Sequence, residues 1–226
     1  MALKKDYATQ DCALARALEL VGERWTMLIV RDAFYGVRRY SDFLAHLDIP
    51  RAVLSARLTT LTTAGVLATH RYSTSPPRDE YLLTPRGQEL WPALYALLTW
   101  GEIHASRPAP RRRLFLHRDC PGPAPARPAH DPPEPAGDRE PGAPAPGRPE
   151  DCPNSPDSAG TSDGEGAPLT AHGGCARCGA ALVPPREVEI RPGPGAGDPH
   201  SEGRTDPVTR ALRRPHRLLD PLEIGG

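Results

Sequence analysis

The chain has 226 residues, 28 basic and 28 acidic side chains and no formal net charge, and 38% of it is hydrophobic. No apolar run reaches the roughly 18–20 residues of a transmembrane helix, and residues 1–10 lack the apolar core of a signal peptide. We therefore expect a cytoplasmic protein with no membrane partner. In that compartment its five cysteines serve as thiols or metal ligands rather than as a disulfide framework.

The composition divides the chain near residue 115. All 12 aromatic residues lie in residues 1–115, whereas the other 111 residues hold 38 of the 50 prolines and glycines. A segment so rich in Pro and Gly, without aromatic side chains, cannot bury enough apolar surface to offset its ordering entropy. The first half carries a net charge of +5 and the second −5. We expect a basic folded domain, suited to a polyanionic partner, followed by a largely disordered Pro/Gly-rich tail.

Capping residues, glycine stops and the spacing of apolar side chains predict the elements of the folded half. Asp11 can cap the first helix, and Thr84-Pro85 is an N-cap followed by proline at the first helical position. In chain order we predict helices over 11–21, 23–34, 41–47 and 51–64, a β-hairpin over 66–72 and 79–84, and a last helix from 84 to about 103. The last helix has an apolar stripe too wide for burial on one side, so a second surface is expected to cover it.

The short helix that begins at Ser41 and the longer helix that begins at Arg51 are joined by the tight connection Asp48-Ile49-Pro50. This arrangement is a helix-turn-helix, and the hairpin that follows is a wing. The predicted fold class is therefore mainly α with a small β-hairpin, a winged helix-turn-helix. The second helix carries small uncharged side chains on its exposed side, which allow a helix to approach base edges in the major groove.

Polar and small residues of this unit are the candidate DNA contacts. Each has a simpler alternative, since Ser41 can merely cap its helix and the others can be a solvated helix face or ordinary exposed strand residues. A charged residue at the edge of the face can serve phosphates rather than bases. The candidates are Ser41, then Arg51, Ala52, Ser55, Ala56, Arg57 and Thr59 on the second helix, and Arg71 and Arg78 on the hairpin.

Five sequence blocks follow one another over about residues 10–105: Asp11–Leu18, Gly22–Arg31, Arg39–Leu44, Leu54–Leu61 with Gly65-Val66-Leu67, and Tyr81–Gly87. In this order they resemble the HxlR family of bacterial winged helix-turn-helix regulators, relatives of the MarR group. The resemblance implies a domain over residues 11–106, a homodimer held by the first and last helices, and sequence-specific binding to promoter DNA. The alternative is a winged helix that binds other proteins, with a partner-recruiting tail.

The sequence does not indicate an enzyme. It contains no nucleophile elbow, no phosphate-binding glycine loop and no HExxH motif. We therefore expect no enzymatic activity and no required cofactor, apart from a structural zinc ion in the second half.

Two short motifs in the second half have the spacing of metal ligands. Cys175 and Cys178 form a knuckle closed by Gly179, and His117 and Cys120 repeat that spacing with one imidazole. Together they are a Cys3His set suited to tetrahedral zinc. Loop-closure entropy grows slowly enough to permit the 54 residues between the two pairs.

This site has open alternatives. Cys152 and His172 are other candidate ligands, and the knuckle alone can be a relic or a redox dithiol. Some members of the resembled family have a compact tail whose end matches Arg186–Val188 and Arg191–Gly195. We thus predict a linker with a low-complexity insertion over 107–174, a zinc-ribbon remnant over 175–195 that pairs with 117–120, and a disordered tail over 196–226.

Cys12 lies at the start of the first predicted helix. It is either a small buried apolar residue or a thiol sensor, because a helix N-terminus favours a thiolate. Several members of the resembled family carry a redox-active cysteine near this position. Both interpretations remain open from the sequence.

Overall fold

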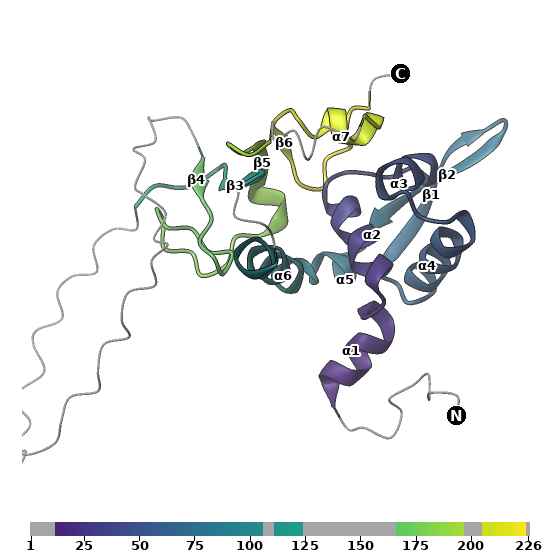
Figure 1. The fold of residues 1–226 in the computed structure, drawn as a ribbon, viewed down its shortest axis with the longest axis horizontal. Helices are drawn as coiled ribbons and strands as arrows, with labels where there is room; N and C mark the ends of the chain where they lie inside the picture. The colour runs from purple at the N-terminus through teal and green to yellow at the C-terminus, as the bar shows by residue number, and fades with distance from the viewer. Residues whose placement is uncertain (1–11, 106–110, 124–165, 197–204, 225–226) are drawn as a thin grey trace, which may run out of the picture.

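The computed structural model describes residues 12–105, 111–123, 166–196 and 205–224. Four helices, α1 (Ala13–Val21), α2 (Arg24–Phe34), α3 (Tyr40–Leu47) and α4 (Arg51–Thr63), precede the hairpin of β1 (Leu67–Thr74) and β2 (Pro77–Leu83). Then come α5 (Pro85–Gln88), α6 (Trp91–His104), β3 (Arg113–His117), β4 (Ala167–Pro168), the 3-10 turn η1 (Pro185–Glu187), β5 (Val188–Pro192), α7 (Pro207–Ala211) and β6 (His216–Arg217) (Figure 1). No helix among these residues is long and apolar enough to cross a membrane.

The core of the first half is formed by the apolar faces of neighbouring helices. α4 buries Leu54, Leu58 and Leu61 at the i, i+4, i+7 spacing that places them on one side of the helix. They pack in one cluster with Phe34 of α2 and Phe43 of α3, both fully buried. These elements and the hairpin confirm the predicted winged helix-turn-helix.

The predicted helix caps agree with the structure at one helix and differ from it at another. Thr84 caps α5 as predicted, since its hydroxyl accepts the Gly87 N–H at 3.1 Å. Ser41 does not cap α3, which begins at Tyr40, and its hydroxyl instead donates to Asp42 at 3.2 Å. Asp11, the predicted cap of the first helix, lies outside the described residues.

The last predicted helix is broken in two. α5 ends at Gln88 and α6 begins at Trp91, with Pro92 in its first turn. Proline has no N–H to donate, and its ring clashes with the carbonyl four residues earlier, so a single helix through this point is disfavoured. Gly87 in α5 lies so close to β1 that a Cβ there would be 2.2 Å from the Val66 carbonyl oxygen.

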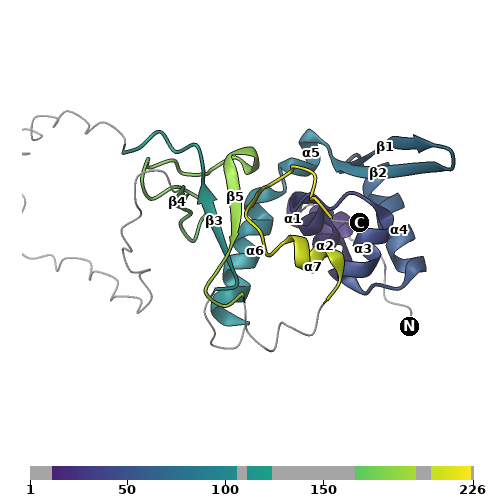
Figure 2. The same ribbon diagram turned by 90° about the horizontal axis from the view of Figure 1, so that it is seen from above.

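The second half forms an antiparallel sheet in the order β4-β3-β5-β6. Figure 2 shows this sheet beside α6. Phe115 of β3 lies 6.0 Å from Trp91 and 5.4 Å from Tyr95 between ring centroids, and the Tyr95 hydroxyl donates to the Thr170 carbonyl at 3.1 Å. Part of the wide stripe of the last helix is therefore covered by the chain's own sheet.

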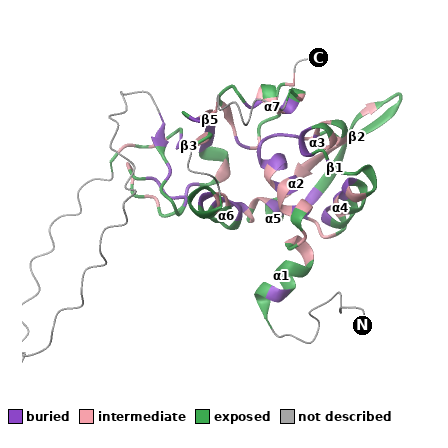
Figure 3. Cartoon of the chain, viewed as in Figure 1, coloured by how far each residue is buried: buried purple, intermediate pink, exposed green. Residues whose placement is uncertain are grey.

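The end of the chain packs on the winged helix. Val208 and Leu212 are buried within the same core, and the Leu219 N–H donates to the Phe34 carbonyl at 2.8 Å. Figure 3 shows buried positions on α7. Residues 196–226 were predicted to be disordered, which is wrong for residues 205–224. The reason is that the apolar side chains of this segment, Val208, Leu212 and Leu218, pack against the core of the winged helix.

Candidate nucleic-acid interface and metal cluster

The exposed side of α4 carries most of the predicted DNA contacts. Its side chains are small and uncharged, with one arginine at the amino-terminal end of the helix. Arg57 differs from the rest, because it is half-buried and its Nε is enclosed without a hydrogen-bond partner among the described residues. The predicted contacts of α4 that are exposed are Arg51, Ala52, Ser55, Ala56 and Thr59.

Tyr40 of α3 ties the two helices of the helix-turn-helix together. Its hydroxyl donates to the Arg51 carbonyl at 3.1 Å and lies 3.2 Å from the Ser55 hydroxyl. Ser55 is thereby held at a defined place on the exposed face of α4. Tyr40 is not among the contacts predicted from the sequence, although a tyrosine at the start of the short helix can reach the next helix.

The two predicted arginines of the wing differ in their surroundings. Arg71 faces Asp79 across the hairpin, with Nε–Oδ1 at 2.7 Å and Nη2–Oδ2 at 3.2 Å. The hydrogen bonds from Arg71 lower the pKa of the Asp79 carboxyl, so this pair is internally neutralised. Arg78 is exposed and forms no ion pair with any described residue. Of the two, Arg78 has the charge available for a partner.

A cavity of about 380 Å³ lies between α3 and the wing. Ser41 and Arg78 both line it, together with Arg39, whose guanidinium stacks over the Tyr72 ring at 4.9 Å from the centroid. Two guanidinium groups beside a hydroxyl form a suitable site for a phosphate group. Arg39 was missed from the sequence, where the pair Arg38-Arg39 directly before the short helix was the available signal.

Four predicted metal ligands come together at the far end of the second sheet. His117 ends β3, Cys120 follows it, and Cys175 and Cys178 occupy the turn after β4. Their ligand atoms all lie within 4.8 Å of one another. Two thiolates on a tetrahedral zinc ion are about 3.8 Å apart, and the Sγ atoms of Cys120 and Cys175 are separated by 3.6 Å.

The backbone and the neighbouring residues orient this cluster. The Gly179 N–H donates to the Cys175 carbonyl at 3.0 Å, with a φ of +74° at Gly179, a conformation that glycine adopts readily. His117 Nδ1 lies 3.6 Å from Cys178 Sγ, while its Nε2 is 3.0 Å from a Glu187 carboxylate oxygen. A carboxylate on the outer nitrogen of a histidine is the usual arrangement in metal sites, because it fixes the ring for ligation. The cluster can therefore hold a metal ion.

The structure tests one of the two alternative ligands. His172 is exposed and outside the group of four, and Cys152 lies outside the described residues. The two ligand pairs come together although 54 residues separate Cys120 from Cys175. Near the end of that stretch, Ala167 of β4 pairs with His117 of β3. Cys12 is exposed at the N-cap of α1, so the interpretation of it as a buried apolar residue is wrong for the single chain.

The first half of the chain is similar to known helix-turn-helix proteins. A family model described as HxlR-like helix-turn-helix matches residues 20–108. The chain is 44% identical over 108 residues to the HTH-type transcriptional regulator Rv3095 of Mycobacterium tuberculosis, covering 48% of this chain and 68% of that protein. It is 36% identical over 91 residues to the HTH-type regulator sll1512 of Synechocystis, covering 40% and 67%. The solved structure of PA1607, a candidate transcription factor, is 36% identical, with a TM-score of 0.46 over 53% of this chain and 83% of that one.

The fold and the family match define a winged helix-turn-helix DNA-binding protein. The chain belongs to the HxlR-like helix-turn-helix family and is a transcriptional regulator. The matching model ends at residue 108. The second sheet, the His/Cys cluster and α7 therefore lie beyond the part of the chain that the family model describes.

Proposed function

We propose that this regulator binds promoter DNA sequence-specifically as a homodimer, with α4 in the major groove and the wing on the backbone or the adjacent minor groove. The observation that carries the proposal is the slim, uncharged face of α4 beside the cavity between α3 and the wing. Ser55 and Thr59 on that face can hydrogen-bond base edges. Arg39 and Arg78 at the cavity can bind a phosphate and so set the register of the helix on the duplex.

A homodimer is supported by apolar surface on two helices. α1 projects from the body of the molecule (Figure 1) and buries only Ala15 of its nine residues. Leu14 is 65% exposed on α1, and Trp100 is 59% exposed on α6. A second copy of the chain that covers these side chains would remove them from water and place two α4 helices in successive major grooves, about one helical turn apart.

The first experiment is a selection of random duplex DNA by the purified protein at near-physiological salt. We expect an enriched inverted repeat whose half-sites are about 10 base pairs apart. Binding without enrichment of any sequence would mean that the protein recognises the charge of DNA and not its sequence. No binding to any duplex would favour the alternative in which the winged helix binds another protein.

Variants on the enriched site then test each surface. Arg78→Ala is expected to weaken binding to all sequences alike and to reduce the salt slope by about one, whereas Arg71→Ala, its matched control, changes little because Arg71 is already paired with Asp79. Ala52→Glu places a carboxylate on the face of α4 and should abolish binding, whereas Ala45→Glu on exposed α3 should not. Equal losses for Arg71 and Arg78 would contradict the assignment of the wing.

The dimer is tested by mass in solution. Wild-type protein is expected to sediment as a dimer and Trp100→Glu as a monomer, because a buried carboxylate without a partner is costly. A wild-type monomer that still selects an inverted repeat would overturn the proposed interface. Cys12→Ser tests the thiol sensor separately: an oxidant response of DNA affinity that survives this change excludes Cys12.

We also propose that the His/Cys cluster holds a structural zinc ion. The support is the Cys3His donor set, the separations of the ligand atoms and the carboxylate of Glu187 behind His117. All four positions of a tetrahedral ion are filled by protein ligands, which is typical of structural rather than catalytic zinc. The ion would join β3 to the turn after β4 and so close the second sheet.

A further inference from the structure

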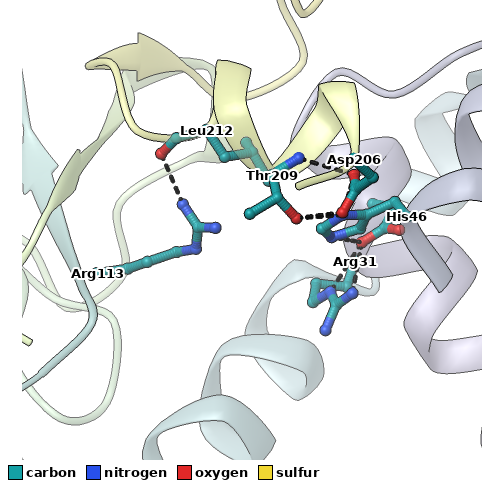
Figure 4. A network of polar contacts seen from close by, with 7 residues as sticks. Arg31, His46, Arg113, Asp206, Thr209 and Leu212 are labelled. Atoms are coloured by element: carbon teal, nitrogen blue, oxygen red, sulfur yellow. Dashed lines mark hydrogen bonds and ion pairs between the residues drawn. The ribbon is translucent and has the colours of Figure 1, made fainter. Parts of the chain in front are cut away.

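A cavity of about 640 Å³ lies where the winged helix meets the second half of the chain. Its walls come from six elements, α2, α3, α6, β3, β5 and α7. In Figure 4, Arg113 of β3 points toward the Leu212 carbonyl on one side, and Arg31 and His46 lie on the other. A volume of this size is typical of sites for small organic molecules.

The charge of the lining is strongly positive. Four arginines line the cavity, Arg31, Arg112, Arg113 and Arg213, and Arg31 is paired with Asp32 at 2.7 Å. The single carboxylate among the described lining residues is Glu102. That carboxylate already faces Arg111, with Nε–Oε2 at 3.7 Å. Burial lowers the pKa of Arg113, and the nearby Arg31 adds to this effect. Guanidinium groups that surround one cavity repel each other. An anion bound between them would reduce this repulsion and would therefore be stabilised.

Part of the remaining lining is apolar. Leu98 of α6, Phe115 of β3 and Leu212, which follows α7, contribute aliphatic and aromatic surface next to the arginines. A bare inorganic anion would satisfy the charges but leave this surface in contact with water. The combination favours a molecule with an anionic head and an apolar body.

The cavity is connected to the helix-turn-helix. His46 of α3 lines it, and its Nδ1 lies 3.3 Å from both the Asp206 carboxylate and the Thr209 hydroxyl. On its other side, His46 Nε2 is 3.7 Å from Asp32, which Arg31 binds at 2.7 Å. A molecule that engages Arg31 or α7 would therefore act on groups that position the first helix of the DNA-binding unit.

We propose that this cavity is the effector site of the regulator and binds an amphipathic organic acid, a carboxylate on an aromatic or short alkyl body. The carboxylate pairs with Arg113 of β3 and with Arg213, which follows α7, and the body packs on Leu98, Phe115 and Leu212. Binding of the acid is independent of the proposed function. Its role as an effector rests on that function, since it requires DNA binding to respond.

The binding test uses calorimetric titration of the full chain with 2-naphthoate as the probe. The neutral 2-naphthamide and inorganic phosphate are the comparison ligands. We expect one naphthoate per chain and at least about tenfold weaker binding of the amide, because a hydrogen bond to a charged group is lost. Phosphate binding as tight as naphthoate would overturn the amphipathic class, and no naphthoate binding at millimolar concentration would overturn the site.

Two variants locate the probe. Gly101 lines the cavity in the middle of α6, and a Cβ there would meet nothing within 4 Å. Gly101→Leu therefore fills the cavity with a residue that favours a helix, and it should abolish binding while the variant stays folded. Arg213→Gln, at the exposed mouth, should weaken binding about tenfold, whereas Arg210→Gln, on α7 but outside the lining, should not. Unchanged binding to Gly101→Leu would place the probe elsewhere and overturn the proposal.

The effector role is measured as the DNA affinity of the wild type with and without saturating naphthoate. A change of about fivefold or more, absent in Gly101→Leu, is expected from reciprocal coupling between the two sites. Binding of naphthoate with unchanged DNA affinity would retain the ligand site and overturn the effector role. Absence of DNA binding under all conditions would instead be a failure of the proposed function.

Discussion

The two halves of this regulator hold their folds in different ways. The winged helix buries large side chains such as Phe34, Phe43 and Leu58 from helices that follow one another along the chain. Among its described residues, the second half has four short strands, two of them of only two residues, and one five-residue α-helix. These elements are held by long-range pairings, by packing against α6 and, in our proposal, by a metal ion at the His/Cys cluster. The difference teaches that a chain segment too poor in apolar residues for its own core can fold on a neighbouring one.

The largest expected effect is loss of the metal cluster. Cys178→Ser should remove the proposed zinc ion, whose binding would contribute on the order of 10 kcal/mol, more than a small sheet can replace. Elemental mass spectrometry should show the loss of about one zinc per chain, and amide exchange should show loss of protection in β3 and β5 only. The control Cys12→Ser, at a thiol outside the cluster, should keep both. Full protection of β3 in the zinc-free variant would show that the second half does not need the metal cluster to keep its fold.

The next effect concerns the aromatic junction between the halves. Phe115→Ala should cost about 3 kcal/mol, near the low end for such a truncation because Phe115 is only half-buried. We expect calorimetry to resolve two transitions in place of one, since the contacts with Trp91 and Tyr95 are lost. Leu58→Ala in α4, the matched change within the winged helix, should cost about 2–5 kcal/mol and lower the transition of that half. A single shifted transition for Phe115→Ala would mean that the sheet is held by other contacts.

A smaller effect is expected at the cap of α7. Burial by itself raises the pKa of Asp206, but hydrogen bonds from Thr209 and the contact with His46 outweigh it, so the pKa lies below its ordinary value. The carboxylate thus stabilises the fold above the ordinary aspartate range, and this contribution is lost as the pH falls through and below about 4. Asp206→Ala should cost about 1 kcal/mol at neutral pH, measured by denaturant unfolding. At pH 3 the variant and the wild type should differ less, and an equal difference at both pH values would contradict the role of the charge.

The smallest effect is at the hydrogen bond that joins α6 to the second half. Burial raises the pKa of Tyr95 to about 12, whereas an exposed tyrosine ionises near pH 10. Between these values the unfolded chain loses the proton more readily, so the free energy of unfolding falls as the pH rises, by at most about 1.4 kcal/mol per pH unit. Tyr95→Phe should cost about 1 kcal/mol at pH 7 and flatten that alkaline decline. A decline of unchanged slope in the variant would assign it to other groups.

Local signals predicted the winged helix well. The i, i+4, i+7 leucines of α4, the Thr84 cap and the tight turn before Pro50 depend on neighbours within a few residues, which a single sequence displays. The same signals failed at Ser41 and at the break before α6. Whether a residue caps a helix depends on the direction of the backbone as well as on the residue type. The apolar stripe continues past Pro92, so the stripe alone does not show that the helix is interrupted there.

The composition of the chain by itself determined that a basic winged helix precedes a Pro/Gly-rich half, and the motif spacing named the four cluster residues. The tertiary structure decided what the spacing could not. It brought His117 to Cys178 across the long insertion, paired Arg71 but not Arg78, and packed Val208 and Leu212 on the winged helix. The physical reason is that these outcomes depend on contacts between distant segments, whose cost of closure and available partners are set by the whole fold and not by the residues alone.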